Sequence, residues 1–138
     1  MALEQNDKTF QFELVSPECV VVSEKAIMVV IPGEEGNFGV LAEHSPLLSS
    51  VRAGVVSVHT PAEGIKRIFV SGGFADVSSE LCSVLVEEAV SVSDLDTDKV
   101  KKEINELEIK LDNAKSVEET ADLRKKIAVA KAKMEFAS

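Results

Sequence analysis

The chain has 138 residues and a formal net charge of −9, and 45% of its residues are apolar while only 4% are aromatic. This length suffices for one domain, or for one small domain with an appendage, whose core must be mainly aliphatic. The acidic excess argues against nucleic-acid or anionic-membrane partners that are recognised through charge. The two cysteines, Cys19 and Cys82, are too few for a disulfide framework and fit a reducing compartment.

The N-terminal sequence MALEQNDKTF has neither a basic n-region nor an apolar h-region, so we expect no signal peptide. No apolar run approaches the ~18 residues that a membrane-spanning helix needs. The chain is therefore expected to be soluble and cytoplasmic.

Residues 8–92 alternate between apolar and polar side chains, which predicts β-strands. Clusters of Pro, Gly and Ser separate the strands, a pattern typical of an antiparallel β-sandwich or a flattened barrel. No helix is expected after the Gly72-Gly73 doublet, so a turn or bulge is favoured there over a dinucleotide-binding loop. The predicted strands cover residues 9–15, 19–31 with a break at 23–25, 53–60, 65–70, 74–79 and 81–92.

The stretch IPGEEGNFGVLAEHSPLL, residues 31–48, contains residue types that are common in active sites. Ser45 lacks the G-x-S-x-G elbow of a nucleophilic serine. The motif PGEEG places carboxylates where a phosphate would sit, and it opens no predicted helix. His44 and His59 lie on separate segments and match no metal-ligand spacing. We therefore expect no catalytic residue, no metal and no cofactor.

The residues of this stretch are better explained as a series of turns than as an active site. Residues 32–33 begin a turn, Gly36, Asn37 and Gly39 permit positive φ, and the segment around His44 forms the next turn. Asn37, Phe38 and His44 then become loop residues that are available for contact, although a core position is the favoured interpretation for Phe38.

Beyond Asp94 the apolar residues recur every three or four positions, which is the spacing of one face of an α-helix. Asp96 is placed to cap a first helix, and Ser116 with Glu119 forms a capping box for a second. Two helices of about 20 residues each would pack as an antiparallel hairpin that is only marginally stable alone, and therefore free to move or to exchange partners. On each helix the residues predicted to face the other helix form one apolar stripe. These stripes are Val100, Ile104, Leu107, Leu111 and Ala114 on the first helix, and Thr120, Leu123, Ile127, Ala130 and Met134 on the second.

The sequence thus predicts a β-sandwich over residues 1–93 and a helical hairpin over residues 94–138. The basic triplet Arg124-Lys125-Lys126 is either a solvated helix face or a docking site for an acidic surface. Two functions remain open at this point: a protein-interaction module that docks other helices through its hairpin, and a small-ligand or sugar-binding sandwich. The second would need exposed aromatic side chains, which are scarce in this chain.

Several segments together resemble one known family: FELVSPE, IPGEEGNFGVLAEHSPLL, RAGVVSV, FVSGGFADV and VLVEEAVSVSDLD, followed by the helical tail. From about Thr9 onward the chain is similar to the epsilon subunits of bacterial F-type ATP synthases, the counterparts of the mitochondrial delta subunit. The resemblance implies the same fold and a non-catalytic rotor subunit without an active site. Such a subunit helps couple ion translocation to ATP synthesis and lies peripherally on the inner face of the bacterial plasma membrane.

The resemblance also implies partners. The sandwich would bind the γ subunit and rest on the c-ring through the loop Glu35, Gly36, Asn37 and Phe38, with the turn near His44. The hairpin would be able to extend along γ and inhibit ATP hydrolysis by contacting the α/β catalytic head. The residues implied in that contact are Arg124, Lys125, Lys126, Lys131 and Lys133.

Some members of this family bind ATP through an I/L-D-x-x-R-A motif. Here the corresponding residues begin with Leu95 and Asp96, but Lys99 replaces the arginine and Val100 replaces the alanine. Lysine cannot form the planar bidentate fork of arginine, and valine crowds a position where a small residue lets a ligand approach. Val90 also stands where ATP-binding members carry an acidic residue. We therefore predict that ATP binding is weak or absent.

Overall fold

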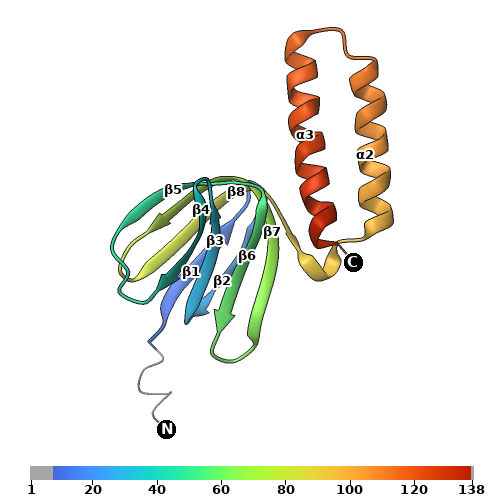
Figure 1. The fold of residues 1–138 in the computed structure, drawn as a ribbon. Coiled ribbons are helices and arrows are strands. Elements are labelled where there is room, and N and C mark those ends of the chain that lie inside the picture. Colours follow the sequence, from blue (N-terminus) through green and yellow to red (C-terminus); the bar gives the residue numbers. More distant parts are fainter. Residues whose placement is uncertain (1–7, 138) are drawn as a thin grey trace. The chain divides into compact units, whose positions relative to one another are not determined.

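The computed structural model describes residues 8–137, which divide into two compact units. The first unit ends at Ser91 and contains the strands, and the second begins at Val92 and contains the helices (Figure 1). The expectation about a signal peptide concerns mainly residues 1–7, which lie outside the described residues.

Within residues 8–91 the structure has eight strands, rich in the β-branched residues that favour extended backbone. They cover every predicted strand and add two, β4 and β5, in the stretch that was expected to form turns and loops. The strands are β1 (Phe10–Val15), β2 (Val20–Ala26), β3 (Met28–Gly33), β4 (Gly36–Leu41), β5 (Leu47–Val51), β6 (Gly54–Thr60), β7 (Gly64–Val77) and β8 (Leu81–Ser91).

Hydrogen bonds join these strands in the order β2-β1-β8-β7-β5-β3-β4, with β6 pairing to both β3 and β7. The pairing is antiparallel except between β1 and β8, which run parallel. The strands form a β-sandwich, and a helical pair follows it in the chain, so the predicted fold class is confirmed.

The core of the sandwich follows directly from the alternation in the sequence. On β1, for example, Phe10, Phe12 and Leu14 are buried while Gln11 and Glu13 face outward. Most of the other core residues are aliphatic, as the low aromatic content predicted. They include Val29, Ile31, Val40, Val56, Val58, Val70, Val77 and Val84.

The Gly72-Gly73 doublet lies inside β7, so it is not the predicted turn between two strands. It is also not a bulge that shifts the register, because Ser71 pairs with Glu88 and Gly73 with Val86 in one continuous register. Both glycines have positive φ, +59° and +139°. They let β7 bend at the point where it passes from its partner β6 to its partner β5.

The break between β2 and β3 was also predicted at the wrong place. Residues 23–25 continue β2, and the single residue Ile27 separates the two strands. The Ile27 backbone N–H donates to the carbonyl of His59 at 2.7 Å. The polar residues that suggested a break belong to a strand at the end of the sheet order, where outward polar side chains are tolerated.

The second unit opens with a short 3₁₀ turn, η1 (Val92–Asp94), followed by α2 (Thr97–Asp112) and α3 (Val117–Phe136). The helices lie side by side as an antiparallel hairpin (Figure 1), and α2, at 16 residues, is shorter than expected. The predicted stripes are confirmed: their residues are buried or half-buried, with Val100, Leu123, Ile127 and Ala130 innermost. Among residues 8–137, neither helix has the length and apolarity needed to cross a membrane.

Both predicted helix caps are confirmed. The Asp96 carboxylate accepts from the backbone N–H groups of Asp98 and Lys99 at 2.9 and 3.4 Å. The Ser116 hydroxyl accepts from the N–H of Glu119 at 3.0 Å, while the Glu119 carboxylate accepts from the N–H of Lys115 at 3.3 Å. The glutamate thus reaches one residue further back than in an ideal capping box.

Candidate partner-binding surfaces

The first candidate surface is the tip of the β3–β4 hairpin. Gly33 pairs with Gly36, so Glu34 and Glu35 alone form the turn, and both carboxylates are exposed. Gly36 has φ +138°, where glycine is favoured, as expected. The tip therefore presents two adjacent negative charges on a tight, well-paired hairpin.

Two details of this region were predicted wrongly. Asn37 and Gly39 do not have positive φ, because they pair with Pro32 and Val30 of β3 and must be extended. Asn37 and Phe38 are consequently strand residues rather than loop residues. The favoured interpretation of Phe38 as a core residue is confirmed, because its side chain is half-buried and packs against the core. A β-carbon on Gly33 would lie only 2.8 Å from the Phe38 ring.

Arg52 fixes the hairpin to the segment after β5. Its guanidinium donates to the carbonyl of Gly33 at 3.1 Å and to the side-chain oxygen of Asn37 at 2.8 Å. Its backbone N–H also donates to the carbonyl of Pro32 at 2.9 Å. Arg52 was not predicted as a functional residue, because its partners lie 15 and 19 residues away and no local motif marks it.

A shallow groove of about 480 Å³ runs between this hairpin and β5. Residues 33–38 form one wall and residues 47–50 the other, including the exposed side chain of Leu48. Four of the predicted contact residues, Glu35, Gly36, Asn37 and Phe38, therefore line one feature.

His44 does not belong to that feature. It follows the opposite end of β4, where its Nδ1 donates to the carbonyl of Ser45 at 2.7 Å. The preceding Glu43 has φ +65°, and its N–H donates to the carbonyl of Ser79 in the β7–β8 turn. The structure thus separates His44 from the hairpin tip at Glu35 and Gly36 by the length of β4, about 17 Å at 3.4 Å per residue, while Asn37 and Phe38 lie along β4 between them.

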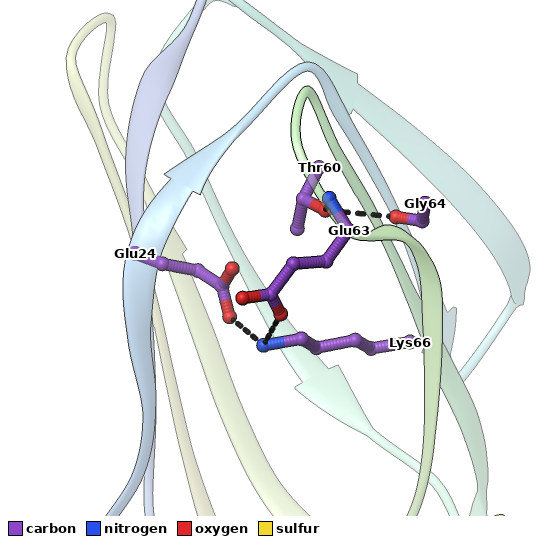
Figure 2. Close-up of polar contacts among 5 residues, drawn as sticks. All are labelled: Glu24, Thr60, Glu63, Gly64 and Lys66. Atoms are coloured by element: carbon purple, nitrogen blue, oxygen red, sulfur yellow. Dashed lines mark hydrogen bonds and ion pairs between the residues drawn. The ribbon is translucent and has the colours of Figure 1, made fainter.

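A charged cluster, separate from the β3–β4 hairpin, joins β2 to the β6–β7 turn (Figure 2). The Lys66 ammonium lies 2.6 Å from the Glu24 carboxylate and 2.8 Å from that of Glu63. The Thr60 hydroxyl shapes the turn by donating to the carbonyl of Gly64 at 2.9 Å and accepting from the N–H of Glu63 at 3.0 Å. Hydrogen bonds to Glu24 and Glu63 raise the pKa of Lys66, and the hydrogen bond and charge of Lys66 lower the pKa of Glu63.

The cysteines do not form a disulfide, and they differ in environment. Cys19 is exposed, whereas Cys82 is buried in the core. Burial, with a smaller contribution from the charge of Asp76, raises the pKa of Cys82 to about 12. This thiol is therefore protonated and unreactive at neutral pH. Within residues 8–137, no three His, Cys, Asp or Glu side chains gather as a metal site requires.

The second candidate surface is the basic part of α3. Arg124, Lys125, Lys126 and Lys131 are exposed, and Lys126 forms an exposed ion pair with Asp122 at 3.3 Å. Lys133 differs, because it is 6% exposed and lies 3.7 Å from the Glu103 carboxylate of α2. In this conformation Lys133 faces the other helix, so it reaches a partner only when the hairpin opens.

The degenerate nucleotide motif spans the start of α2. Asp96 is used as the helix cap, Leu95 is half-buried, and Lys99 is exposed. Val100 is buried, as its place in the apolar stripe predicted. Weak or absent ATP binding remains a prediction that the geometry does not test.

The fold and its surfaces define a class of protein: a β-sandwich with a tight acidic hairpin, followed by an amphipathic helical pair with a basic face. A profile of the ATP synthase delta/epsilon chain β-sandwich domain matches residues 9–92. The chain is 42% identical to an ATP synthase epsilon chain of Rhodospirillum rubrum, over 91% of this chain and 93% of that one. It is 43% identical to the epsilon chain of Paramagnetospirillum magneticum, over 88% and 92% of the two chains.

Solved structures of low sequence identity share the fold. A chain of the Euglena gracilis mitochondrial ATP synthase (OSCP/F1/c-ring) matches with a TM-score of 0.74 and 21% identity, covering 90% of this chain and 78% of that one. A chain of the Tetrahymena thermophila mitochondrial ATP synthase (central stalk/c-ring) matches with a TM-score of 0.67 and 9% identity, over 96% and 98%. The chain belongs to the ATP synthase delta/epsilon family, as an epsilon-type subunit of the F-type enzyme.

Proposed function

We propose that this chain is a non-catalytic subunit of the central stalk, the rotor that couples ion translocation to ATP synthesis. The observation that carries the proposal is the 42% identity to the Rhodospirillum rubrum epsilon chain, because it extends over both the sandwich and the helices. The solved structure of similar fold from Tetrahymena thermophila is a central stalk/c-ring assembly, which supports the same place in the complex.

The sandwich is the part that binds the γ subunit and the c-ring. The hairpin tip, with Glu35, Gly36, Asn37 and Phe38, is our proposed c-ring contact, because its turn residues are exposed and Arg52 holds it in place. A c-ring contact that also includes His44 would have to extend along the whole of β4. Through the c-ring the chain would be peripheral on the inner face of the bacterial plasma membrane, without inserting into the bilayer.

The helical hairpin is the regulatory part of the proposal. When open, it would reach the α/β catalytic head and inhibit ATP hydrolysis through Arg124, Lys125, Lys126, Lys131 and Lys133. Two features support this role: few large residues hold the hairpin closed, and a lysine is buried between its helices. A closed pair of this kind is a two-state element that a partner can shift by binding the open form.

The test compares ATP hydrolysis by the complex reconstituted with the full chain or with a chain truncated after Ser93. Co-purification of γ is measured on the same samples. We expect both forms to retain γ and only the full chain to suppress hydrolysis. Equal hydrolysis with both would remove the regulatory role of the hairpin, and loss of γ from both would reject the rotor proposal itself.

A charge variant tests whether the basic residues of α3 are responsible for the inhibition. Replacing Arg124, Lys125 and Lys126 by Gln should relieve inhibition, because it removes three of the exposed positive charges of α3. The matched control replaces Lys101, Lys102 and Lys110 of α2, which are also exposed, by Gln. Relief of inhibition by both triple variants would indicate a general effect of charge rather than docking by α3.

A further inference from the structure

The side chain of Arg52 bridges the two strands of the β3–β4 hairpin at the base of its turn. Its Nη1 donates to the carbonyl of Gly33, the last residue of β3, at 3.1 Å. Its Nη2 donates to the side-chain oxygen of Asn37, the second residue of β4, at 2.8 Å. A guanidinium presents its donors in a planar fork, so one group can meet both acceptors at once. Arg52 thereby links the strands on either side of the turn.

The bond to Arg52 also fixes the orientation of the Asn37 amide. Every nitrogen of a guanidinium is a donor, so the Asn37 atom that faces it must be the amide oxygen. The NH₂ group lies at the other corner of the same planar amide and is directed away from Arg52. Asn37 is exposed, whereas the next residue, Phe38, packs against the core. The start of β4 therefore carries an exposed amide with its donors held in one orientation.

The backbone that carries Arg52 is itself held against β3. The Arg52 N–H donates to the carbonyl of Pro32 at 2.9 Å, and the Glu34 N–H donates to the carbonyl of Ser50 at 3.0 Å. Two residues further on, a β-carbon at Gly54 would lie only 2.9 Å from the β-carbon of Pro32. The side chain of Arg52 thus extends to β4 from a backbone that is fixed on β3.

Neutralisation of the turn carboxylates does not explain these contacts. Both acceptors of the Arg52 guanidinium are uncharged, a backbone carbonyl and an amide oxygen. Glu34 and Glu35 are exposed, and neither forms an ion pair within residues 8–137. The geometry therefore fits a residue that orients the tip and leaves its charges available.

We propose that Arg52 is a positioning residue for the c-ring contact, and that it acts through Asn37. It holds the Asn37 amide so that the NH₂ group can donate to a hydrogen-bond acceptor on the c-ring. The inference rests on the proposed function, in which this tip contacts the c-ring. An amide that is already oriented loses less conformational entropy on binding than one that rotates freely, so the Arg52–Asn37 bond strengthens a contact that Arg52 itself does not make.

The experiment measures amide hydrogen exchange of residues 34–38 in the isolated full chain and in the purified ATP synthase complex. The ratio of the two rates is the protection that the complex gives to the tip. Arg52→Lys keeps the positive charge but loses the planar fork, and Asn37→Ala removes the amide. We expect each change to reduce the protection about fivefold, because one oriented hydrogen bond is lost. Arg67→Lys, at an exposed position of β7, is the matched control and should leave the protection unchanged.

A double variant separates positioning from an independent contact. Arg52→Lys combined with Asn37→Ala should lose no more protection than Asn37→Ala alone, because Arg52 acts through Asn37. A loss near the product of the two single effects, about 25-fold, would overturn the inference, since Arg52 would then act independently. Unchanged protection in either single variant, or an equal loss in Arg67→Lys, would overturn it as well.

Asn37→Asp tests the donor without releasing the hairpin. A carboxylate still accepts from Arg52 but offers no N–H, so exchange in the isolated chain should match the wild type. Protection in the complex should again fall about fivefold, and full protection would overturn the inference.

The wild-type chain distinguishes this inference from the proposed function. If it co-purifies with γ and its tip is protected, failure of the variants to change that protection overturns the role of Arg52 alone. If it co-purifies with γ but its tip is not protected, the c-ring contact at the tip is rejected, and this inference with it. If it does not co-purify with γ, the rotor proposal itself fails.

Discussion

Of the seven glycines, Gly73 is the one at which the fold leaves least room for a side chain. A β-carbon there would lie 1.9 Å from the carbonyl oxygen of Leu85, and its φ of +139° is unfavourable for any other residue. We predict that Gly73→Ala destabilises the sandwich by about 3 kcal/mol or more, because clash and backbone strain add. Urea unfolding followed by circular dichroism would measure the loss.

Gly39→Ala is the control for this prediction. A β-carbon at Gly39 meets no atom within 4 Å, and the residue does not have positive φ, so the change should stay within about 1 kcal/mol. Similar unfolding midpoints for the two variants would show that β7 can bend without its glycine.

Lys66 links β2 to the β6–β7 turn through Glu24 and Glu63 (Figure 2). The lowered pKa of Glu63 contributes stability that is present above its ordinary value of 4.5 and is lost as pH falls through the folded-state pKa. The raised pKa of Lys66 contributes stability that is present below 10.5 and is lost as pH rises through the folded-state value. The cluster should therefore stabilise the sandwich between these limits.

We predict that Lys66→Met lowers the urea midpoint at pH 7, and that the difference from the wild type falls to about half or less at pH 3. Lys25→Met, which changes an exposed lysine on β2 next to Glu24, is the control and should show little difference at either pH. A difference for Lys66→Met that stays constant from pH 7 to pH 3 would mean that packing of its methylene chain, rather than its charge, matters.

At the scale of elements, the start of α3 depends on one side chain. The Ser116 hydroxyl caps the helix through the N–H of Glu119 at 3.0 Å. Ser116→Ala should cost the hairpin about 1 kcal/mol and thereby speed amide hydrogen exchange in the first turns of α3 about fivefold. Val117→Ala, at the exposed next position, should leave exchange unchanged. Equal exchange in the wild type and Ser116→Ala would show that α3 opens only together with α2.

The sequence predicted the helices better than the strands, for a physical reason. Stripes and caps of a helix depend on residues three and four apart, so Val100 to Ala114 and Thr120 to Met134 were identified correctly. Strand limits depend on partners far along the chain. For example, β7 continues through Gly72 because β8 spans both halves of it and because Gly73 also pairs with Val51 of β5.

The candidate surfaces were predictable to a similar extent. The glycine turn of the β3–β4 hairpin follows from local sequence, and so does the exposure of the basic triplet on α3. The position of His44 at the other end of β4, the clamp formed by Arg52 and the burial of Lys133 depend on tertiary contacts. No periodicity in a single sequence reports such contacts, which is why these three features appeared only in the structure.

At the scale of the whole molecule, the two units are stabilised very differently. The sandwich has a cluster of seventeen buried apolar residues, several of them without any exposed surface. In the described part of the hairpin the buried apolar residues are Val100, Leu123, Ile127 and Ala130, and a lysine is buried beside them. Since apolar burial is the main stabilising term, the hairpin should open at much lower free-energy cost than the sandwich.

We therefore predict that thermal unfolding is not two-state. The helical signal at 222 nm should be lost at a lower temperature than the near-ultraviolet signal of the sandwich, whose core contains the buried phenylalanines Phe10 and Phe12. A chain truncated after Ser93 should keep the upper transition and lack the lower one. A single transition shared by both signals would mean that the hairpin is held by more than its own contacts. It would then not open on its own, and the proposed regulatory role would require a partner to pull it open.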